Sequence, residues 1–278
     1  MKKLGFIGTG SMGGLIIEAF IKGGQIKAEH IHMTNRTLEK AKQLQLRHKK
    51  TVVHHDIYSV INHADWIFIC TKPMEMVHVL KDISNLLRPD QVVITITSPL
   101  QVEESEQILN KQAVVRFIPS IVNLSLEGPS LITYSNRCSS DLRDELTSLF
   151  SSISNPVTID PSITRVASDI ASCGPAFISF LIERMIKGAV DETKIDEKTA
   201  TIIAESMLIG FGELLKQKHF DLATLRKRVT VPGGVTGVGL KVLQNETGWM
   251  FHELFRETEK KYVEDRQGIS KQLNNKGS

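Results

Sequence analysis

A glycine-rich turn near the start of the chain limits the possible folds more than any other feature. An apolar run over residues 4–7 predicts a buried parallel strand, the pattern G-x-G-x-x-G follows over 8–13, and a helix is predicted over 15–21. Such glycines allow a tight turn, backbone approach to a pyrophosphate and close helix packing. The helix N-terminus adds free N–H groups for phosphates.

A plain strand–helix turn is the alternative. The dinucleotide-binding interpretation expects cofactor contacts from Gly8, Gly10, Ser11 and Met12.

The end of the second predicted strand, 31–34, indicates which dinucleotide binds. Sites for NAD usually place an acidic residue here, where it holds the ribose hydroxyls. This chain instead reads Asn35-Arg36-Thr37. Arg36 can pair with a 2′-phosphate as a planar donor fork, and its two neighbours can add neutral hydrogen bonds. We therefore expect NADP(H) rather than NAD(H), the alternative being that Arg36 only begins the next helix in solvent.

Strands and helices alternate through residues 1–160. This alternation predicts an α/β fold with a Rossmann-type doubly wound sheet, and we assign 1–160 as an NADP-binding domain. The predicted strands are 4–7, 31–34, 51–53, 65–70, 92–96, 113–117, 130–135 and 157–159.

Two loops follow buried strands at the edge where open α/β sheets bind ligands. The first is Thr71-Lys72-Pro73, in which Pro73 is suited to the first position of a helix. Lys72 is either a cofactor contact or a solvated turn lysine. The second loop contains Ser120, which we expect at the cofactor edge.

Composition excludes several classes of protein. The 278 residues are 41% hydrophobic and 23% charged, and the net charge of +3 is too small to argue for nucleic acid but suits an anionic ligand. Three widely spaced cysteines and the absence of Cys/His ligand spacing argue against a disulfide framework or a metal site. We expect a cytoplasmic protein, with charges interrupting every apolar stretch before it could span a membrane.

The second half, 161–278, is predicted to be all-helical. The segments 177–190 and 198–216 are apolar on almost all faces. One small helical domain has too little interior to bury both. We therefore expect a dimerisation and substrate domain that forms a homodimer or higher homo-oligomer.

Two turns in this half each precede a predicted helix. One is 172–176, which contains Cys173, and the other is 230–237, which contains a Gly-Gly pair. A glycine-rich loop that opens a helix can hold a carboxylate on its N–H groups. The alternative is that both are ordinary helix starts. The substrate interpretation places Val231, Gly233 and Gly234 around the carboxylate, with Thr236 Oγ1 bonding a neighbouring substrate atom.

With these motifs in hand, the chain resembles the pyrroline-5-carboxylate reductase family. The motifs occur in the family's order along nearly the whole chain. They are Gly5-Phe6-Ile7-Gly8-Thr9-Gly10-Ser11-Met12, Asn35-Arg36-Thr37, Lys72-Pro73, Gly174-Pro175-Ala176-Phe177 and Pro232-Gly233-Gly234-Val235-Thr236. The resemblance implies an NADP-binding domain, a helical domain interlocking two subunits, an active site at the dimer interface, and reduction of 1-pyrroline-5-carboxylate to L-proline.

Departures from the family pattern fall on the substrate side. Val231 stands where the family usually has serine, Ser120 falls where its Met-Pro-Asn-Thr-Pro segment would be, and Cys173 lies in a turn that is usually rich in serine and glycine. These changes resemble the divergent late-competence branch of the family.

The resemblance implies Thr236 as the catalytic contact. Nothing adjacent to Cys173 would lower its thiol pKa, so close packing explains this residue better than nucleophilic catalysis. Two other functions stay open. One is another NADP-dependent dehydrogenase of a small substrate, such as a β-hydroxyacid. The other is a non-catalytic regulator that keeps the cofactor fold.

Overall fold

A computed structural model describes residues 2–109 and 111–274 of the chain. It divides into two compact units. Unit 1 consists of Met1–Pro175 together with the chain from Glu257 onward, and unit 2 is Ala176–Arg256. We predicted one boundary after residue 160, whereas unit 1 runs fifteen residues further and takes back the end of the chain. The assignment of roles to the two domains stays a prediction.

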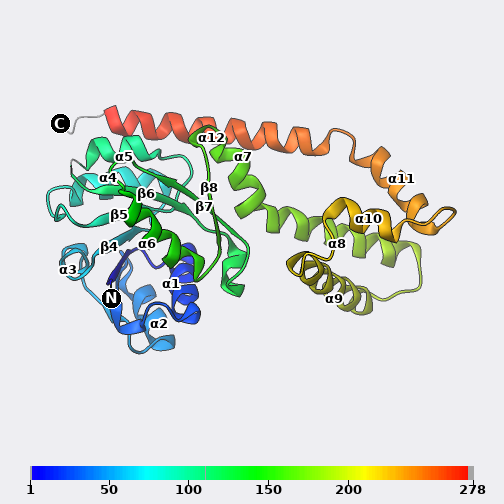
Figure 1. Cartoon of the computed structure of the whole chain (residues 1–278), viewed down its shortest axis with the longest axis horizontal. Coiled ribbons are helices and arrows are strands. Elements are labelled where there is room, and N and C mark those ends of the chain that lie inside the picture. The colour runs from blue at the N-terminus through cyan, green and yellow to red at the C-terminus, as the bar shows by residue number, and fades with distance from the viewer. Residues whose placement is uncertain (1, 110, 275–278) are drawn as a thin grey trace. The chain divides into compact units, whose positions relative to one another are not determined.

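Within the described residues, unit 1 contains one eight-stranded sheet with the order β3-β2-β1-β4-β5-β6-β7-β8 (Figure 1). All neighbouring strands are parallel except β6 and β7, which are antiparallel. The order reverses between β1 and β4, and ligands bind at the carboxyl ends of strands beside such a reversal. The predicted doubly wound α/β class is confirmed. The strands are β1 (Leu4–Ile7), β2 (Ile31–Thr34), β3 (Val52–Val53), β4 (Trp66–Ile69), β5 (Val92–Thr95), β6 (Ala113–Ile118), β7 (Pro129–Tyr134) and β8 (Asn155–Thr158).

Helices cover both faces of this sheet, each over its own apolar core. One core joins the sheet to α1, α2 and α6, and includes the stacked rings of Phe6 and Phe68, whose centres are 4.7 Å apart. The other core joins the opposite face to α3, α4, α5 and α12. The central strands are buried on both faces, which explains their near-continuous apolar sequence. The helices are α1 (Ser11–Gly23), α2 (Leu38–Arg47), α3 (Ile57–His63), α4 (Pro73–Ile83), α5 (Val102–Ile108), α6 (Ser140–Ser151) and α12 (Met250–Asn274), with short helices η1 (Ala28–His30) and η2 (Ile121–Ser125).

The last helix, α12, joins unit 1 through its C-terminal half. Ile269 is fully buried in the core beneath α4 and α5. Arg266 Nη1 donates to Pro99 O at 2.9 Å and pairs with Glu104 Oε2 at 2.5 Å. We assigned all of 161–278 to the helical domain, whereas the chain from Glu257 onward belongs to unit 1. On α12 the charged residues outnumber the apolar side chains that pack against the sheet domain, Ile269 and the partly buried Leu273.

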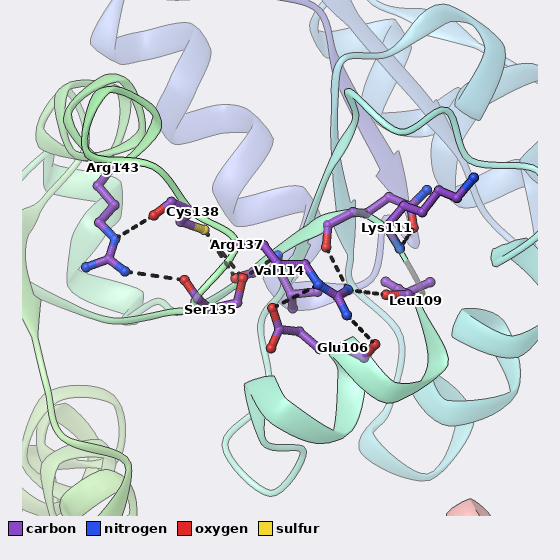
Figure 2. Close-up of polar contacts among 9 residues, drawn as sticks. Glu106, Leu109, Lys111, Val114, Ser135, Arg137, Cys138 and Arg143 are labelled. Atoms are coloured by element: carbon purple, nitrogen blue, oxygen red, sulfur yellow. Dashed lines mark hydrogen bonds and ion pairs between the residues drawn. The ribbon is translucent and has the colours of Figure 1, made fainter.

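The loop between β7 and α6 is held by two arginines (Figure 2). Arg137 donates to the carbonyls of Leu109 and Glu106 near the end of α5, and Arg143 Nε donates to Cys138 O at 3.1 Å. A cation near a helix C-terminus satisfies carbonyls that the helix leaves unpaired. These contacts hold the loop that follows the antiparallel strand β7.

The segment Pro161–Glu192 is an almost continuous run of helical structure. It contains η3 (Pro161–Ile163), α7 (Thr164–Ser168), a π-helical stretch η4 (Asp169–Cys173) and α8 (Gly174–Glu192). The predicted turn before Gly174 was therefore wrong. Pro175 lacks an N–H and crowds the preceding turn, and a π-helical stretch accommodates both effects without breaking the helix.

The same segment meets the length and composition expected of a membrane span, with a mean hydropathy of 1.3 in its most apolar window. We expected charged residues to interrupt every apolar stretch before it could span a membrane. The composition of this segment contradicts that expectation. A single helix of this kind is weak evidence of a membrane segment.

Unit 2 is helical, as predicted. Besides most of α8 it contains α9 (Glu197–Lys216), α10 (Leu222–Val229) and α11 (Val235–Thr247). Asp196 and Asp221 cap α9 and α10 through their side chains. Most large apolar side chains of this unit are exposed, among them Phe180 at 60%, Ile209 at 75% and Val235 at 88%.

Candidate nucleotide and substrate sites

The glycine turn after β1 has the shape of a dinucleotide cradle. Gly8 has φ +106°, and a Cβ there would lie 2.6 Å from Cys70 O. A Cβ at Gly13 would lie 2.1 Å from Gly8 O, so α1 packs against the turn more closely than any side chain allows. At Gly10 a Cβ would meet nothing within 4 Å. There is therefore no room for a side chain at Gly8 or Gly13, whereas the space beside Gly10 is open to a ligand.

Two pockets of unit 1 meet at this turn. One, of about 560 Å³, is bordered by the glycine turn, the loop after β2, the start of α3 and the loop after β4. The other, of about 460 Å³, borders the first turn of α1 and η2. Of the predicted cofactor residues, Gly8, Gly10, Asn35, Arg36, Thr37, Thr71 and Lys72 line the first pocket, and Gly10 and Ser11 line the second.

Asn35 lines the larger pocket and also makes two hydrogen bonds within the protein. Its Oδ1 accepts a hydrogen bond from Thr9 N at 2.9 Å, and its Nδ2 donates to Thr37 O at 2.9 Å. The side chain thus joins the loop after β2 to the glycine turn. Its polar atoms are already used in shaping the pocket, so we assign Asn35 to positioning the loop.

Arg36 is an exposed cation on the pocket wall. Its side chain is 83% exposed and its Nη1 lies 3.1 Å from Glu75 Oε1 on α4. An exposed pair of this kind contributes little to stability. The guanidinium is therefore free to exchange a carboxylate for a phosphate. Glu75 and Lys40, which also line the pocket, are two residues that the sequence analysis missed.

Four buried hydroxyls at the carboxyl edge of the sheet have no hydrogen-bond partner among the described residues. They are Thr9 Oγ1 after β1, Thr71 Oγ1 after β4, Thr95 Oγ1 at the end of β5 and Ser120 Oγ after β6. Buried polar groups without partners are uncommon in folded proteins. A row of them beside the open glycine fits a polar ligand such as a dinucleotide, which would supply the missing partners.

The other predicted cofactor residues have mixed placements. Pro73 is at the start of α4, as predicted. Met12 packs partly against the core beneath α1. Lys72 precedes α4 and lines the larger pocket. Cys70 lines the same pocket, and burial raises the pKa of its thiol well above the usual range, so it stays protonated.

Unit 2 has a shallow pocket of its own over the glycine loop that precedes α11. Its volume is about 490 Å³, and Val231, Gly233, Gly234 and Lys241 are among the residues that line it. Gly233 has φ +74°, and a Cβ at Gly234 would come within 2.8 Å of the Val231 side chain, so the loop requires both glycines. The glycine pair thus sets the backbone path of the loop.

One predicted donor in this loop is already used. Gly234 N donates to Val231 O at 3.0 Å, so this N–H is not available to a carboxylate. Helix geometry leaves the next first-turn N–H groups of α11, those of Val235 and Thr236, without intrahelical partners. Thr236 is half-buried and is not among the residues that line the pocket.

Lys241 is a candidate that the sequence analysis missed. It lines the pocket together with Gly234, Gly237 and Val238. The spacing i, i+3, i+4, i+7 identifies these residues as one face of α11, and this signal was available in the sequence.

Cys173 lies in the π-helical stretch of unit 1, whereas the glycine loop before α11 belongs to unit 2. Its Sγ accepts a hydrogen bond from Arg165 Nη2 at 3.5 Å. The same Nη2 pairs with Asp169 Oδ1 at 2.6 Å, and Asp169 Oδ2 accepts from Thr258 Oγ1 at 2.7 Å. The thiol therefore lies within a buried polar network that joins this segment to α12.

Two family models match separate parts of the chain. Residues 161–265 match the family described as pyrroline-5-carboxylate reductase dimerisation. Residues 3–99 match the family described as NADP oxidoreductase, coenzyme F420-dependent.

Similar proteins extend along nearly the whole chain. ComE operon protein 4 of Bacillus subtilis is 42% identical over 271 residues, covering 98% of this chain and 99% of the relative. Pyrroline-5-carboxylate reductase 3 of the same organism is 26% identical over 274 residues, covering 98% of this chain and 100% of the relative.

Solved structures share the fold at lower identity. A pyrroline carboxylate reductase of Plasmodium falciparum with NADP bound has a TM-score of 0.81 at 21% identity, covering 96% of this chain and 98% of that one. A pyrroline-5-carboxylate reductase of Coxiella burnetii also has a TM-score of 0.81 at 21% identity, covering 96% and 97%.

Proposed function

The chain belongs to the pyrroline-5-carboxylate reductase family, and from this premise we propose that it is an NADPH-dependent reductase of a cyclic imine carboxylate, 1-pyrroline-5-carboxylate, with L-proline as product. The observation that carries the proposal is the open glycine of the β1–α1 turn beside the four unpartnered hydroxyls. A polar ligand of dinucleotide size would supply hydrogen-bond partners for these hydroxyls.

The nucleotide is held by three kinds of group. The N-terminus of α1 and the open backbone at Gly10 take the pyrophosphate. Arg36 takes the 2′-phosphate in exchange for Glu75. Thr71 and Ser120 donate their hydroxyls to polar atoms of the cofactor. Bound NADPH supplies a hydride.

The substrate carboxylate is held by unit 2. The first-turn N–H groups of Val235 and Thr236 and the ammonium of Lys241 offer donors of the right charge. Thr236 Oγ1 hydrogen-bonds the ring nitrogen. We therefore move the carboxylate site one or two residues along from Gly234, whose N–H is taken by Val231.

The chain's own part in the reaction is orientation. The C=N carbon gains a hydride, the imine nitrogen gains one proton, and the product is a secondary amine. Such imines take their proton from solvent, so no strong general acid is required of the protein. Holding the imine in one orientation supplies most of the acceleration that residues can give here.

We also propose that the chain forms a homodimer through its helical region. The exposed apolar side chains of unit 2 form a surface much richer in large hydrophobic groups than a monomer usually carries. The match of 161–265 to a dimerisation family supports this assignment and gives the apolar segment 161–192 a role in the interface. Light scattering of the purified full chain measures the oligomer directly, and a monomer at micromolar concentration would contradict the proposal.

NADPH consumption with 1-pyrroline-5-carboxylate, followed by identification of the product, tests the activity. We expect proline formation, a large loss of kcat in Thr236→Ala, and a raised KM with little change in kcat in Lys241→Met. Lys227→Met, in α10 and outside the pocket-lining residues, is the control for loss of one positive charge in unit 2. A protein that binds NADPH and leaves this imine untouched would refute the proposal.

One observation favours a second function. Val231 presents an apolar, 59% exposed side chain at the substrate loop, where a reductase of this family usually has serine. This favours a regulator that binds NADP(H) without turnover. Tight NADPH binding with no turnover of any imine or hydroxyacid would support it, and turnover of a β-hydroxyacid would favour a dehydrogenase instead.

A further inference from the structure

Three histidines of unit 1 come together away from the glycine turn. His32 is on β2, His54 directly follows β3, and His63 is the last residue of α3. They are 22 and 9 residues apart in the sequence, so no short ligand motif predicts their meeting. One nitrogen of each ring lies within 4.8 Å of the corresponding nitrogen of each other ring.

The separations of the rings match those of imidazoles around one metal ion. The ring centres are 5.2 Å apart for His32–His54, 5.3 Å for His32–His63 and 5.0 Å for His54–His63. Three imidazoles bound to zinc at about 2.0–2.1 Å with tetrahedral angles would have ring centres about 5 Å apart. The spacing of the ring centres is therefore compatible with one shared ion.

Hydrogen bonds orient two of the rings for this role. His63 Nδ1 lies 2.7 Å from Ser59 O and must donate its proton to that carbonyl, which leaves the Nε2 lone pair free. A ligating histidine usually donates its other N–H in this way. His32 Nδ1 and His54 Nε2 face each other at 2.9 Å, where a metal ion can replace the proton they share.

The protein does not satisfy His32 by itself. The residue is 5% exposed, and among the described residues its Nδ1 has only His54 as a partner. Its Nε2, the nitrogen away from His54, has no hydrogen-bond partner in the described part of the chain, and an ion bound to Nδ1 would leave that N–H unpaired. Burial and the neighbouring imidazoles of His54 and His63 lower the pKa of His32. Asp56 is the nearby acid that acts on His54, and Lys3 is the nearby cation that acts on His32.

We propose that His32, His54 and His63 bind a divalent transition-metal ion of the zinc class, with a fourth position open to solvent on the exposed His63 side. Three imidazole nitrogens suit zinc, cobalt, nickel or copper and do not suit magnesium or calcium, which require oxygen ligands. The ion cross-links β2, β3 and α3. These elements lead into Asn35–Arg36 and into His55–Ile57, two walls of the larger nucleotide pocket.

Cobalt and zinc binding to the full chain, after treatment with a chelator, tests the site. We expect one ion per chain, visible Co²⁺ absorption of a low-coordinate nitrogen site, displacement of Co²⁺ by Zn²⁺, and a higher thermal unfolding midpoint with Zn²⁺. His63→Gln should weaken binding at least tenfold, because it removes a ligand and outer-shell losses alone cost 10- to 100-fold. His63 is exposed, so this variant folds even if His32→Gln does not.

The control is His219→Gln, an exposed histidine of unit 2, which should bind cobalt as the wild type does. Equal affinity in His63→Gln and the wild type, or an unsaturated Co²⁺ spectrum at one equivalent, would overturn the proposal. Loss of binding in His219→Gln would also overturn it. These readouts do not depend on NADPH or imine turnover, so they stand apart from the proposed activity.

Discussion

Replacement of Arg36 by methionine should separate NADPH binding from NADH binding. Methionine keeps the length of the side chain and its fit in a helix-entry loop, and it removes the planar charged donor. The Arg36 guanidinium pairs with Glu75, and the two side chains are 83% and 41% exposed. Removing this pair therefore changes the stability of the free protein little, and the substitution mainly weakens the complex with NADPH.

The magnitude follows from two contributions. Charge-assisted hydrogen bonds from Arg36 to a 2′-phosphate contribute about 1.5–3 kcal/mol. Giving up the exposed pair with Glu75 costs about 0.2–1 kcal/mol of this. The net difference of about 0.5–2.8 kcal/mol corresponds to NADPH binding that is about 2- to 110-fold weaker in the variant. NADH has no 2′-phosphate, so its dissociation constant should change less than twofold.

Fluorescence titration of NADPH and NADH against the wild type and Arg36→Met measures both constants. Lys42→Met is the matched control, because Lys42 is on α2 beside Glu39 and lines neither pocket. It loses the same charge and should leave both constants unchanged. Equal weakening of both nucleotides in Arg36→Met would refute the argument, since it would mean that Arg36 shapes the pocket and does not read the phosphate.

Glu75→Gln should tighten NADPH binding by about 1.5- to 5-fold, because Arg36 no longer has to leave a carboxylate to reach the phosphate. The affinity for NADH should stay unchanged. Weaker NADPH binding in the same titration would contradict this prediction. Gly10→Ala should unfold at the wild-type temperature and lose at least tenfold in NADPH affinity, whereas Gly13→Ala should lower the melting temperature by forcing a Cβ against Gly8 O. Similar melting curves for the two variants would remove the distinction between the open and the closed glycine. Ile269→Ala should lower the free energy of unfolding by about 2–5 kcal/mol in urea denaturation, because the side chain is fully buried under α4 and α5; a change below 1 kcal/mol would mean that α12 is not fixed to unit 1 by this contact.

The alternating pattern of the first half was sufficient to predict the sheet. Within the described residues, the eight strands lie within a few residues of their predicted positions. The central strands β1, β4, β5 and β6 were predictable because each is a short, buried apolar run followed by a turn signal. The glycine turn was readable for the same reason. The steric limit at Gly13 comes from Gly8 O and is local, whereas the limit at Gly8 comes from Cys70 O, directly after the neighbouring strand β4.

Features that depend on long-range contacts were beyond local pattern. The π-helical stretch before Gly174 was predicted as a turn, since Gly-Pro usually breaks a helix and only the surrounding helix shows that the distortion is absorbed. The return of α12 to unit 1 rests on Ile269 and on Arg266 meeting Glu104, a residue 162 positions away. Nothing in the periodicity of a charged helix identifies which unit it joins.

The candidate sites divide in the same way. Residues such as Gly10 and Arg36 were predicted from the sequence alone, because the chemistry of a bound phosphate requires these residue types at this spacing. The use of Asn35 as a loop brace, the pairing of Arg36 with Glu75, and the meeting of three histidines depend on side chains brought together by the parallel crossovers of the sheet. Local sterics and hydrophobic period are properties of the sequence, whereas the partner of a polar side chain is fixed only when distant segments pack against each other.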